Sequence, residues 1–517
     1  MATKVALTKT GKIFFTVVAG IFVIILIISG ISMFGDKLFD KKKSEPGNEA
    51  RGGLFSGLFG SKDFVKISLD EWIGWKSLLD ANGGLKTRRG SINDGLGINV
   101  EYIVSNDATV SSNLLIKGDI KGAGYTINRY AFLANKFDSS GLNTKMVYIT
   151  NFSNGGDGII SKSSIRGIED LQGKKVAIPR FSEAQTLVEW LLNASDLSTS
   201  VKEGIRKSYV FFETPDDCAK AFFAGDVDAA ATWEPYLTQA KETANARILF
   251  STRQATNLIL DGLVFRSDFL EQNGEFVKKL IDGALQASTM YTTEFTSIRE
   301  LPLFAIESNQ SIVEMADGAA LATWSDNTRL FSGEAQRMFS DMSGIWLSVG
   351  ERANPDPGYA DKRFSISYVK ELESSYRGNE AKPASVFTPK VREVVAEKPN
   401  DEALLKKSLI INFGTDSAVI HADSYKELND FANIAKSLNR VVIQIEGNTD
   451  SVGNPEYNKV LSLQRAQSIA LYLQAQDIDK DRFIIIGNGI SNPIASNNTV
   501  EGRAANRRTD IFFKPID

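Results

Sequence analysis

The chain has 517 residues, of which 43% are hydrophobic and 24% are charged, and this is enough for two to four globular domains. Its 59 basic and 63 acidic residues give a formal net charge of -4 and no basic excess, so we expect no nucleic-acid partner. The single cysteine and single histidine exclude an intramolecular disulfide and a structural zinc site built from such ligands. We therefore expect neither a metal nor a cofactor.

The first element in chain order is an apolar segment over residues 13–34, which contains no charged residue. As a helix it would be about 33 Å long, slightly more than a bilayer hydrocarbon core. A buried core helix would need a polar face, and a signal peptide would have a shorter apolar region with a better cleavage site. We therefore predict a cytoplasmic tail over residues 1–12 and an uncleaved membrane anchor. Residues 35–62 are rich in Gly, Ser and Lys and predict a flexible linker.

Residues 63–375 alternate short apolar runs with amphipathic stretches at helical spacing. This alternation predicts an α/β module with mostly parallel sheets, in which ligands bind at the carboxyl ends of the strands. The predicted strands lie within residues 64–69, 98–104, 146–150, 175–179, 207–212, 229–233 and 247–250.

Several segments of this region then follow one another in a specific order. They are Trp72-Ile-Gly-Trp75, GDIKGAGYT at 118–126, SNGGDG at 153–158, IEDLQGKKVAIP at 168–179 and FFETPDDCAKAFFAGDVDAAATWEP at 211–235. The order resembles the periplasmic solute-binding proteins for sulfonate, taurine and nitrate, over most of residues 64–270. The resemblance implies a two-lobed type II periplasmic-binding-protein-like fold that closes on a small solute by hinge motion. Lobe one would comprise residues 63–157 and 260–375, and lobe two residues 158–259.

Strand ends and helix starts supply the candidate solute-binding residues. They are Trp72, Thr126, Ser153, Asp157, Ser182, Gln185, Trp233, Glu234 and Asp261. Simpler roles stay open, because Ser182 could only cap its helix and the two tryptophans could only pack. If the three acidic residues face inward, the cleft favours a cationic or hydrogen-bonding ligand over a plain anion, so the charge of the solute stays open.

One enzyme branch resembles the same binding proteins. It is the pyrimidine synthase of thiamine biosynthesis, which uses a cysteine-rich segment and a histidine that it consumes. This chain has Cys218 alone, on a predicted helix over residues 216–223 where it fits a small core residue. We therefore predict that the protein is not an enzyme.

Residues 376–402 contain Pro383, Pro389 and Pro399 and predict an extended linker before a domain over residues 403–517. Strands are predicted at 408–414, 441–447, 482–486 and 509–513, with helices at 424–438 and from Asn454-Pro455 onward. Asn454 and Pro455 fit an N-cap followed by a proline at the first helical position. The pattern predicts an α+β domain.

This domain contains Gly447-x-Thr-Asp450, Asn458-x-x-Leu-Ser-x-x-Arg-Ala466 and Glu501-Gly-Arg-x-x-Asn-Arg-Arg508. In this order the motifs resemble the OmpA-like peptidoglycan-binding domain. The resemblance implies that Asp450 and Arg465 hold the diaminopimelate of the stem peptide, whose ammonium and carboxylates need one anionic and one guanidinium partner. The weaker candidates are Thr449, Asn458, Arg508 and Phe413. The family often has His where this chain has Asn448, and we expect little effect on wall binding.

Wall binding would place everything after the anchor in the periplasm, so we predict a single-pass inner-membrane protein with a cytoplasmic N-terminus. One hypothesis is that the middle module binds a small solute for transport or sensing, with a permease as a possible partner. The other is that it has lost solute binding and serves as a structural element of a cell-envelope complex. A flagellar-type stator is disfavoured, because residues 13–34 contain no carboxylate.

Overall fold

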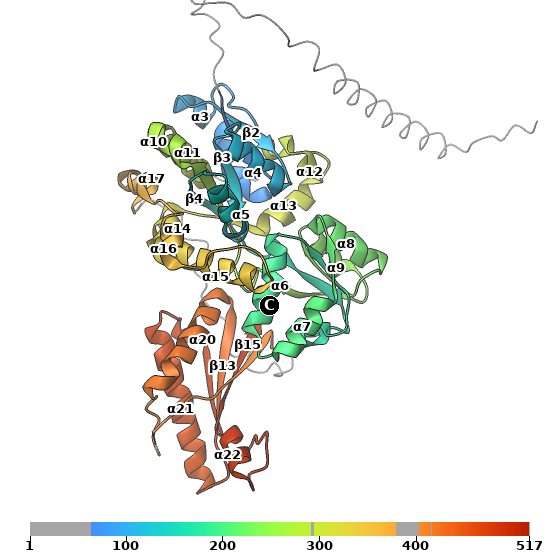
Figure 1. Cartoon of the computed structure of the whole chain (residues 1–517), viewed down its shortest axis with the longest axis vertical. Coiled ribbons are helices and arrows are strands. Elements are labelled where there is room, and N and C mark those ends of the chain that lie inside the picture. Colours follow the sequence, from blue (N-terminus) through green and yellow to red (C-terminus); the bar gives the residue numbers. More distant parts are fainter. Residues whose placement is uncertain (1–63, 291–293, 379–402, 415, 516–517) are drawn as a thin grey trace, which may run out of the picture. The chain divides into compact units, whose positions relative to one another are not determined.

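The structure is a computed structural model that describes residues 64–290, 294–378, 403–414 and 416–515 (Figure 1). The predicted membrane segment, the linker at 35–62 and nearly all of the linker at 376–402 lie outside the described residues. Within the described ranges, none of the helices combines the length and apolar character that a membrane crossing needs.

Lobe one is built on a six-stranded sheet with the order β11-β4-β10-β3-β1-β2. Its strands are β1 (Val65–Leu69), β2 (Val100–Val104), β3 (Gly122–Thr126), β4 (Thr144–Ser153), β10 (Leu260–Arg266) and β11 (Ala319–Leu321). The longer helices of its two chain segments are α2 (Lys76–Asn82), α4 (Ala108–Lys117), α5 (Ile127–Ser139), α11 (Gly274–Thr289), α13 (Asn309–Asp317) and α15 (Ala335–Ser348). The shorter ones are α3 (Ile92–Gly95), α10 (Ser267–Gln272), α12 (Pro302–Ala305), α14 (Trp324–Arg329), α16 (Pro357–Asp361), α17 (Ser367–Lys370) and α18 (Glu373–Tyr376).

Lobe two is built on a five-stranded sheet with the order β7-β6-β8-β5-β9. Its strands are β5 (Asp157–Lys162), β6 (Val176–Pro179), β7 (Tyr209–Phe212), β8 (Ala229–Trp233) and β9 (Ala246–Ser251), and its helices are α6 (Glu183–Ala194), α7 (Thr199–Lys207), α8 (Pro215–Ala224) and α9 (Tyr236–Glu242). The chain passes from one sheet to the other between β4 and β5 and returns between β9 and β10, which agrees with the expected division into lobes.

The prediction of mostly parallel sheets was wrong. Parallel pairing holds for β1 with β2 and β3 and for β6 with β7 and β8. After each passage between the lobes, however, the next strand enters its sheet in the opposite direction. Thus β5 is antiparallel to β8 and β9, and β10 is antiparallel to β3 and β4. Local alternation of strands and helices cannot reveal this reversal, because it depends on which sheet the next strand joins.

The C-terminal domain has a four-stranded sheet with the order β12-β15-β13-β14, and helices α20 and α21 pack against it (Figure 1). Its elements are β12 (Leu405–Leu409), α20 (Tyr425–Ser437), β13 (Val441–Asn448), α21 (Pro455–Ala475), β14 (Phe483–Gly489), α22 (Val500–Asn506) and β15 (Thr509–Pro515). Asn454 caps α21 through its side-chain oxygen, as predicted. The first strand, by contrast, begins three residues earlier than predicted, because Leu405–Leu409 pairs with the end of β15.

Two candidate binding sites

A cavity of about 20 Å³ lies between the two lobes of the middle module. It is lined by Asp70, Trp72, Thr126, Asp157, Glu183, Trp233, Ile259 and Asp261. Space of this size holds about one water molecule or one ammonium-sized group.

Strand ends bring the lining residues of lobe one together. Asp70 directly follows β1 and Thr126 ends β3, and these two strands are parallel, so their carboxyl ends meet at one edge of the sheet. Asp261 lies opposite Thr126 in the antiparallel pair of β10 with β3. In lobe two, Asp157 pairs in the same way with Trp233 across β5 and β8. The cavity therefore lies at the edge where the sequence rule for α/β sheets predicts a ligand.

The charged groups around the cavity are mostly acidic. Arg129 on α5 forms an ion pair with Glu183 on α6 at 2.8 Å, which joins the two lobes. Asp70 accepts a hydrogen bond from the indole N–H of Trp75 at 2.6 Å. The carboxylates of Asp70, Asp157, Glu183 and Asp261 thus lie around the one guanidinium group of Arg129.

Burial is the main cause of the pKa shifts in this cluster. Together with the charge of the nearby Glu183, it raises the pKa of Asp157 to about 7, although a 2.6 Å hydrogen bond from the Ser153 hydroxyl acts in the opposite direction. Burial and the charges of Asp70, Asp157 and Glu183 hold the pKa of Asp261 well above its ordinary value. The pKa of Asp70 is raised by burial as well. A cation in the cavity would relieve this repulsion.

Of the nine predicted solute-binding residues, five line the cavity. They are Trp72, Thr126, Asp157, Trp233 and Asp261. The other four make local contacts. Ser153 donates to Asp157, and Ser182 accepts from the N–H of Gln185 as the N-cap of α6. Gln185 accepts from the N–H of Phe181, and Glu234 accepts from Thr238.

The sequence reasoning missed Asp70, Glu183, Ile259 and Arg129. Asp70 could have been found, because it directly follows the first predicted strand and so obeys the strand-end rule. Glu183 and Arg129 lie in the first turns of α6 and α5, where the direction of a side chain depends on how the two lobes pack. No local pattern contains that information.

Direct contacts between the lobes surround the cavity. The rings of Phe132 and Phe181 stack with centroids 4.8 Å apart, and the amide of Asn128 donates to the hydroxyl of Thr186 at 2.8 Å. Arg253 of lobe two pairs with Asp317 of lobe one at 2.9 Å. The lobes are therefore held together by their own side chains as well as by the crossover strands.

The second candidate site is a groove of about 280 Å³ in the C-terminal domain. Arg465 of α21 lies over the ring of Phe413, with its guanidinium carbon 5.0 Å from the ring centroid. Its Nε donates to the carbonyl of Ser417 at 3.0 Å. The groove is lined by Ile410, Ile411, Asn412, Phe413, Gly447, Asn448, Arg465, Ala504, Arg507, Arg508 and Thr509.

Asp450 does not line this groove itself, but it forms an ion pair at 2.7 Å with Arg507, which does. The Thr449 hydroxyl donates to the carbonyl of Asp450, and the side chain of Asn458 donates to the carbonyl of Val452 in the same loop. These two residues therefore shape the loop rather than the groove. The role of Arg507 was missed, although it lies inside the predicted C-terminal motif.

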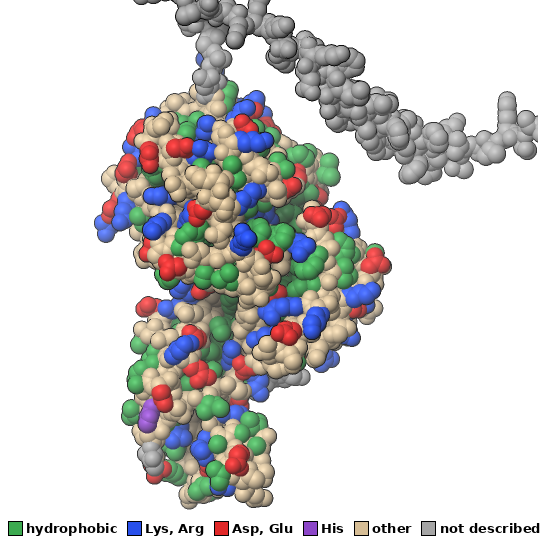
Figure 2. Space-filling view, in the orientation of Figure 1, with side chains coloured by type: hydrophobic (Ala, Val, Ile, Leu, Met, Phe, Trp, Pro, Cys, Tyr) green, Lys and Arg blue, Asp and Glu red, His purple; other side chains and the backbone are tan. Residues whose placement is uncertain are grey.

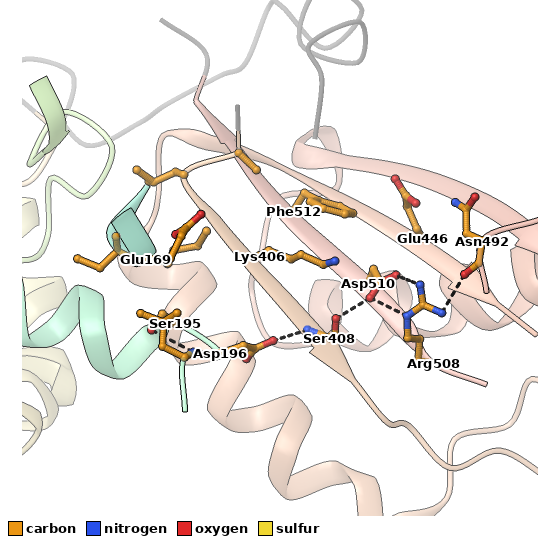
Figure 3. Close-up of a pocket in the computed structure, with 15 residues that line it drawn as sticks. Glu169, Ser195, Asp196, Lys406, Ser408, Glu446, Asn492, Arg508, Asp510 and Phe512 are labelled. Carbon is orange, nitrogen blue, oxygen red and sulfur yellow. Dashed lines mark hydrogen bonds and ion pairs between the residues drawn. The ribbon is translucent and has the colours of Figure 1, made fainter. Parts of the chain in front are cut away.

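Arg508 is held in a buried network that Figure 3 shows in detail. Its guanidinium pairs with Asp510 at 2.7 Å and donates to the carbonyl of Asn492 at 3.1 Å. The Ser408 hydroxyl donates to the same carboxylate at 2.6 Å. Asn448, where the family often has His, donates to Asp510 as well. Little of the bonding capacity of Arg508 is therefore left for a ligand.

The single cysteine and the single histidine of the chain, Cys218 and His421, lie outside both sites. Cys218 is fully buried on α8, as expected of a core residue. His421 precedes α20 and is exposed, and it is visible on the surface in Figure 2. On the face shown there, acidic and basic side chains are interspersed over the described part of the chain.

The structure thus combines a two-lobed α/β module with an α+β domain that carries an arginine-rich groove. Residues 96–294 match the family described as NMT1/THI5 like, and residues 412–507 match the OmpA family. Through this C-terminal domain the chain belongs to the OmpA family. Both matches agree with the resemblances read from the sequence motifs.

Curated relatives match the C-terminal part. Outer membrane protein A of Bordetella avium is 38% identical over 122 residues, which are 23% of this chain and 63% of that protein. The peptidoglycan-associated lipoprotein of Buchnera aphidicola is 34% identical over 116 residues, 22% of this chain and 67% of that protein. The peptidoglycan-binding protein ArfA of Mycobacterium tuberculosis (strain ATCC 25618 / H37Rv) is 43% identical over 101 residues, 20% of this chain and 31% of that protein. The chain thus spans less than two thirds of the first of these relatives.

Solved structures match the middle module at low identity. The periplasmic aliphatic sulphonate binding protein SsuA from Escherichia coli aligns with a TM-score of 0.46 and 17% identity, over 57% of this chain and 96% of that one. The periplasmic nitrate-binding protein NrtA from Synechocystis PCC 6803 aligns with a TM-score of 0.47 and 14% identity, over 61% of this chain and 89% of that one.

Proposed function

We propose that the protein binds peptidoglycan through its C-terminal domain and a small solute through its two-lobed module, while residues 13–34 anchor it in the inner membrane. The observation that supports wall binding most strongly is the groove in which Arg465, held over Phe413, lies with Arg507, the ion-pair partner of Asp450. Guanidinium groups bind the carboxylates of a diaminopimelate stem peptide, and a carboxylate binds its ammonium group. Relatives named as a peptidoglycan-binding protein and as a peptidoglycan-associated lipoprotein match this same part of the chain.

Co-sedimentation of the detergent-solubilised full chain with diaminopimelate-type sacculi tests the proposal. We expect Arg465→Ala and Asp450→Ala each to reduce the pelleted fraction. The apparent affinity for sacculi should fall at least about tenfold, since each substitution removes a charge-assisted contact. Lys480→Ala and Asp481→Ala change the same charges at exposed positions of the same domain and serve as matched controls. Unchanged pelleting of both site variants would contradict wall binding at this groove.

The proposed anchor has its own test. Deleting residues 13–34 should move the protein from the membrane fraction to the soluble fraction, because a stretch of this length without charges is long enough to span the bilayer. The intact chain should stay in the membrane after alkaline carbonate washing, and external protease should reach it only once the outer membrane is opened. Release of the intact chain by carbonate would contradict an integral anchor.

The contacts between the lobes favour a second candidate function, in which the module is a structural or interaction element of an envelope complex. The cavity of about 20 Å³, the Arg129–Glu183 ion pair and the Phe132–Phe181 stack leave little room for a solute. Thermal-shift screening of the full chain against amines, sulfonates, nitrate, phosphate and amino acids separates the two functions. A stabilising compound supports solute binding, whereas no response to any class supports the structural role.

A further inference from the structure

The carboxylate of Asp261 lies at the interlobe cavity and has no hydrogen-bond partner among the other residues that line it. Asp261 is 4% exposed and lines the cavity. Within the described part of the chain its carboxylate makes no hydrogen bond or close ion pair, whereas Asp70, Asp157 and Glu183 each have a polar partner. A buried carboxylate without a partner is costly, so it indicates a missing cationic or donor group.

The charge of the surroundings points the same way. Four acidic side chains lie around the guanidinium of Arg129, which is already paired with Glu183, so these residues offer an anion entering the cavity no unpaired cation. Two indole side chains, Trp72 and Trp233, also line the cavity, and indole rings attract cations. Their N–H groups are already bonded to Asn151 and Asp216, so neither is free to bind an anion.

Size and geometry narrow the kind of cation. Among the described residues there is no group of three acidic, histidine or cysteine side chains that could hold a metal ion. The space of about 20 Å³ admits one small group, which fits a primary ammonium and is too small for a quaternary one. A primary ammonium has three N–H donors, which suits several carboxylates placed around it.

Resting on the proposed solute-binding function, we infer that the two-lobed module binds a solute through a primary ammonium group held by Asp261 and Asp157 between Trp72 and Trp233, and that it rejects sulfonates and nitrate. The ammonium group would give Asp261 the partner that it lacks. The rest of the solute would extend between the lobes as they open, because the cavity admits only the head group. The solute class is therefore a small organic amine.

Calorimetric titration of the detergent-solubilised full chain tests the inference with matched probes: methylammonium against methanesulfonate, and ethanolamine against choline and nitrate. We expect the primary amines to bind and the anions and choline not to bind. Asp261→Asn should weaken amine binding by about ten- to a hundredfold, the usual effect of losing a charged hydrogen-bond acceptor. Asp226→Asn makes the same change at an exposed position of lobe two and should leave binding unchanged.

Folding of the variant is checked in the same samples. Asp261→Asn should leave the melting temperature unchanged or raise it, because it removes an acid whose charged form is buried beside other carboxylates. Lost binding can then not be mistaken for unfolding. Binding of methanesulfonate or nitrate without any amine would overturn the amine inference and leave solute binding intact. If none of the probes bound, the solute-binding function itself would be overturned. Equal binding of amines by Asp261→Asn and the parent chain would overturn the assigned role of Asp261.

Discussion

At the scale of single residues, the arginines of the C-terminal groove differ in what they already bind. The Arg508 and Asp510 side chains are each 5% exposed and are paired with each other. Arg465, in contrast, lies over Phe413 at the groove and has one backbone contact. Both arginines lie in motifs of the family pattern, so the sequence does not distinguish their roles. Their contacts do: Arg508 supports the domain, whereas Arg465 faces the groove.

This difference predicts distinct effects of two substitutions. Arg508→Ala should destabilise the domain by about 3–5 kcal/mol, because it leaves the Asp510 carboxylate buried without its partner. Arg465→Ala should cost about 1 kcal/mol or less while removing wall binding, since its pair with Phe413 lies at the groove surface. Calorimetric unfolding of the full chain measures both values. Equal losses of stability would contradict the division of roles.

At the scale of elements, the sequence predicts well where strands end and which residues cap helices. It predicts poorly which elements pack against one another and in which direction a strand enters its sheet. Thr126 and Ser182 cap α5 and α6 as the local pattern indicates, because a cap depends on neighbours in sequence. The ion pair of Arg129 with Glu183 joins two helices of different lobes, and residue spacing within either helix says nothing of it. The same limit explains the antiparallel strands β5 and β10 and the displaced start of β12. About half of the interlobe site could therefore be read from strand-end positions.

A close approach of β13 to α21 explains why the first motif of the C-terminal domain begins with Gly447. A Cβ atom at Gly447 would lie 2.1 Å from the backbone oxygen of Ser462, so no side chain fits there. Gly447→Ala should prevent α21 from packing and lower the melting temperature sharply. Gly204→Ala, on helix α7 with open space around it, should be neutral or stabilising by up to about 1 kcal/mol. Equal melting temperatures of the two variants would contradict the contact.

At the scale of the whole molecule, the carboxylates between the lobes make the module sensitive to pH. Burial raises the pKa of Asp157 to about 7, and Asp70, Glu183, Arg129 and Asp261 face it across the cavity. An acid with a raised folded-state pKa contributes stability that is complete below its ordinary pKa near 4 and is lost as the pH rises through about 7. The module should therefore lose on the order of a few kcal/mol between pH 4 and pH 8.

Thermal unfolding from pH 4 to pH 8, compared with Asp157→Asn, measures this loss. The substitution should flatten the pH dependence, whereas Asp226→Asn should not. Interference from histidine is small, because the chain has one histidine and it lies in the C-terminal domain. A parent chain whose stability rises with pH relative to Asp157→Asn would contradict the raised pKa.

The single thiol of the chain makes lobe motion directly measurable. Cys218 is fully buried on α8, and burial raises its pKa, so it is a poor target for thiol reagents in the folded protein. Cysteines introduced at one exposed site on each lobe could carry a donor and an acceptor dye without removal of the native residue. The distance between the dyes would then report, one molecule at a time, how far the lobes separate when a candidate solute is added.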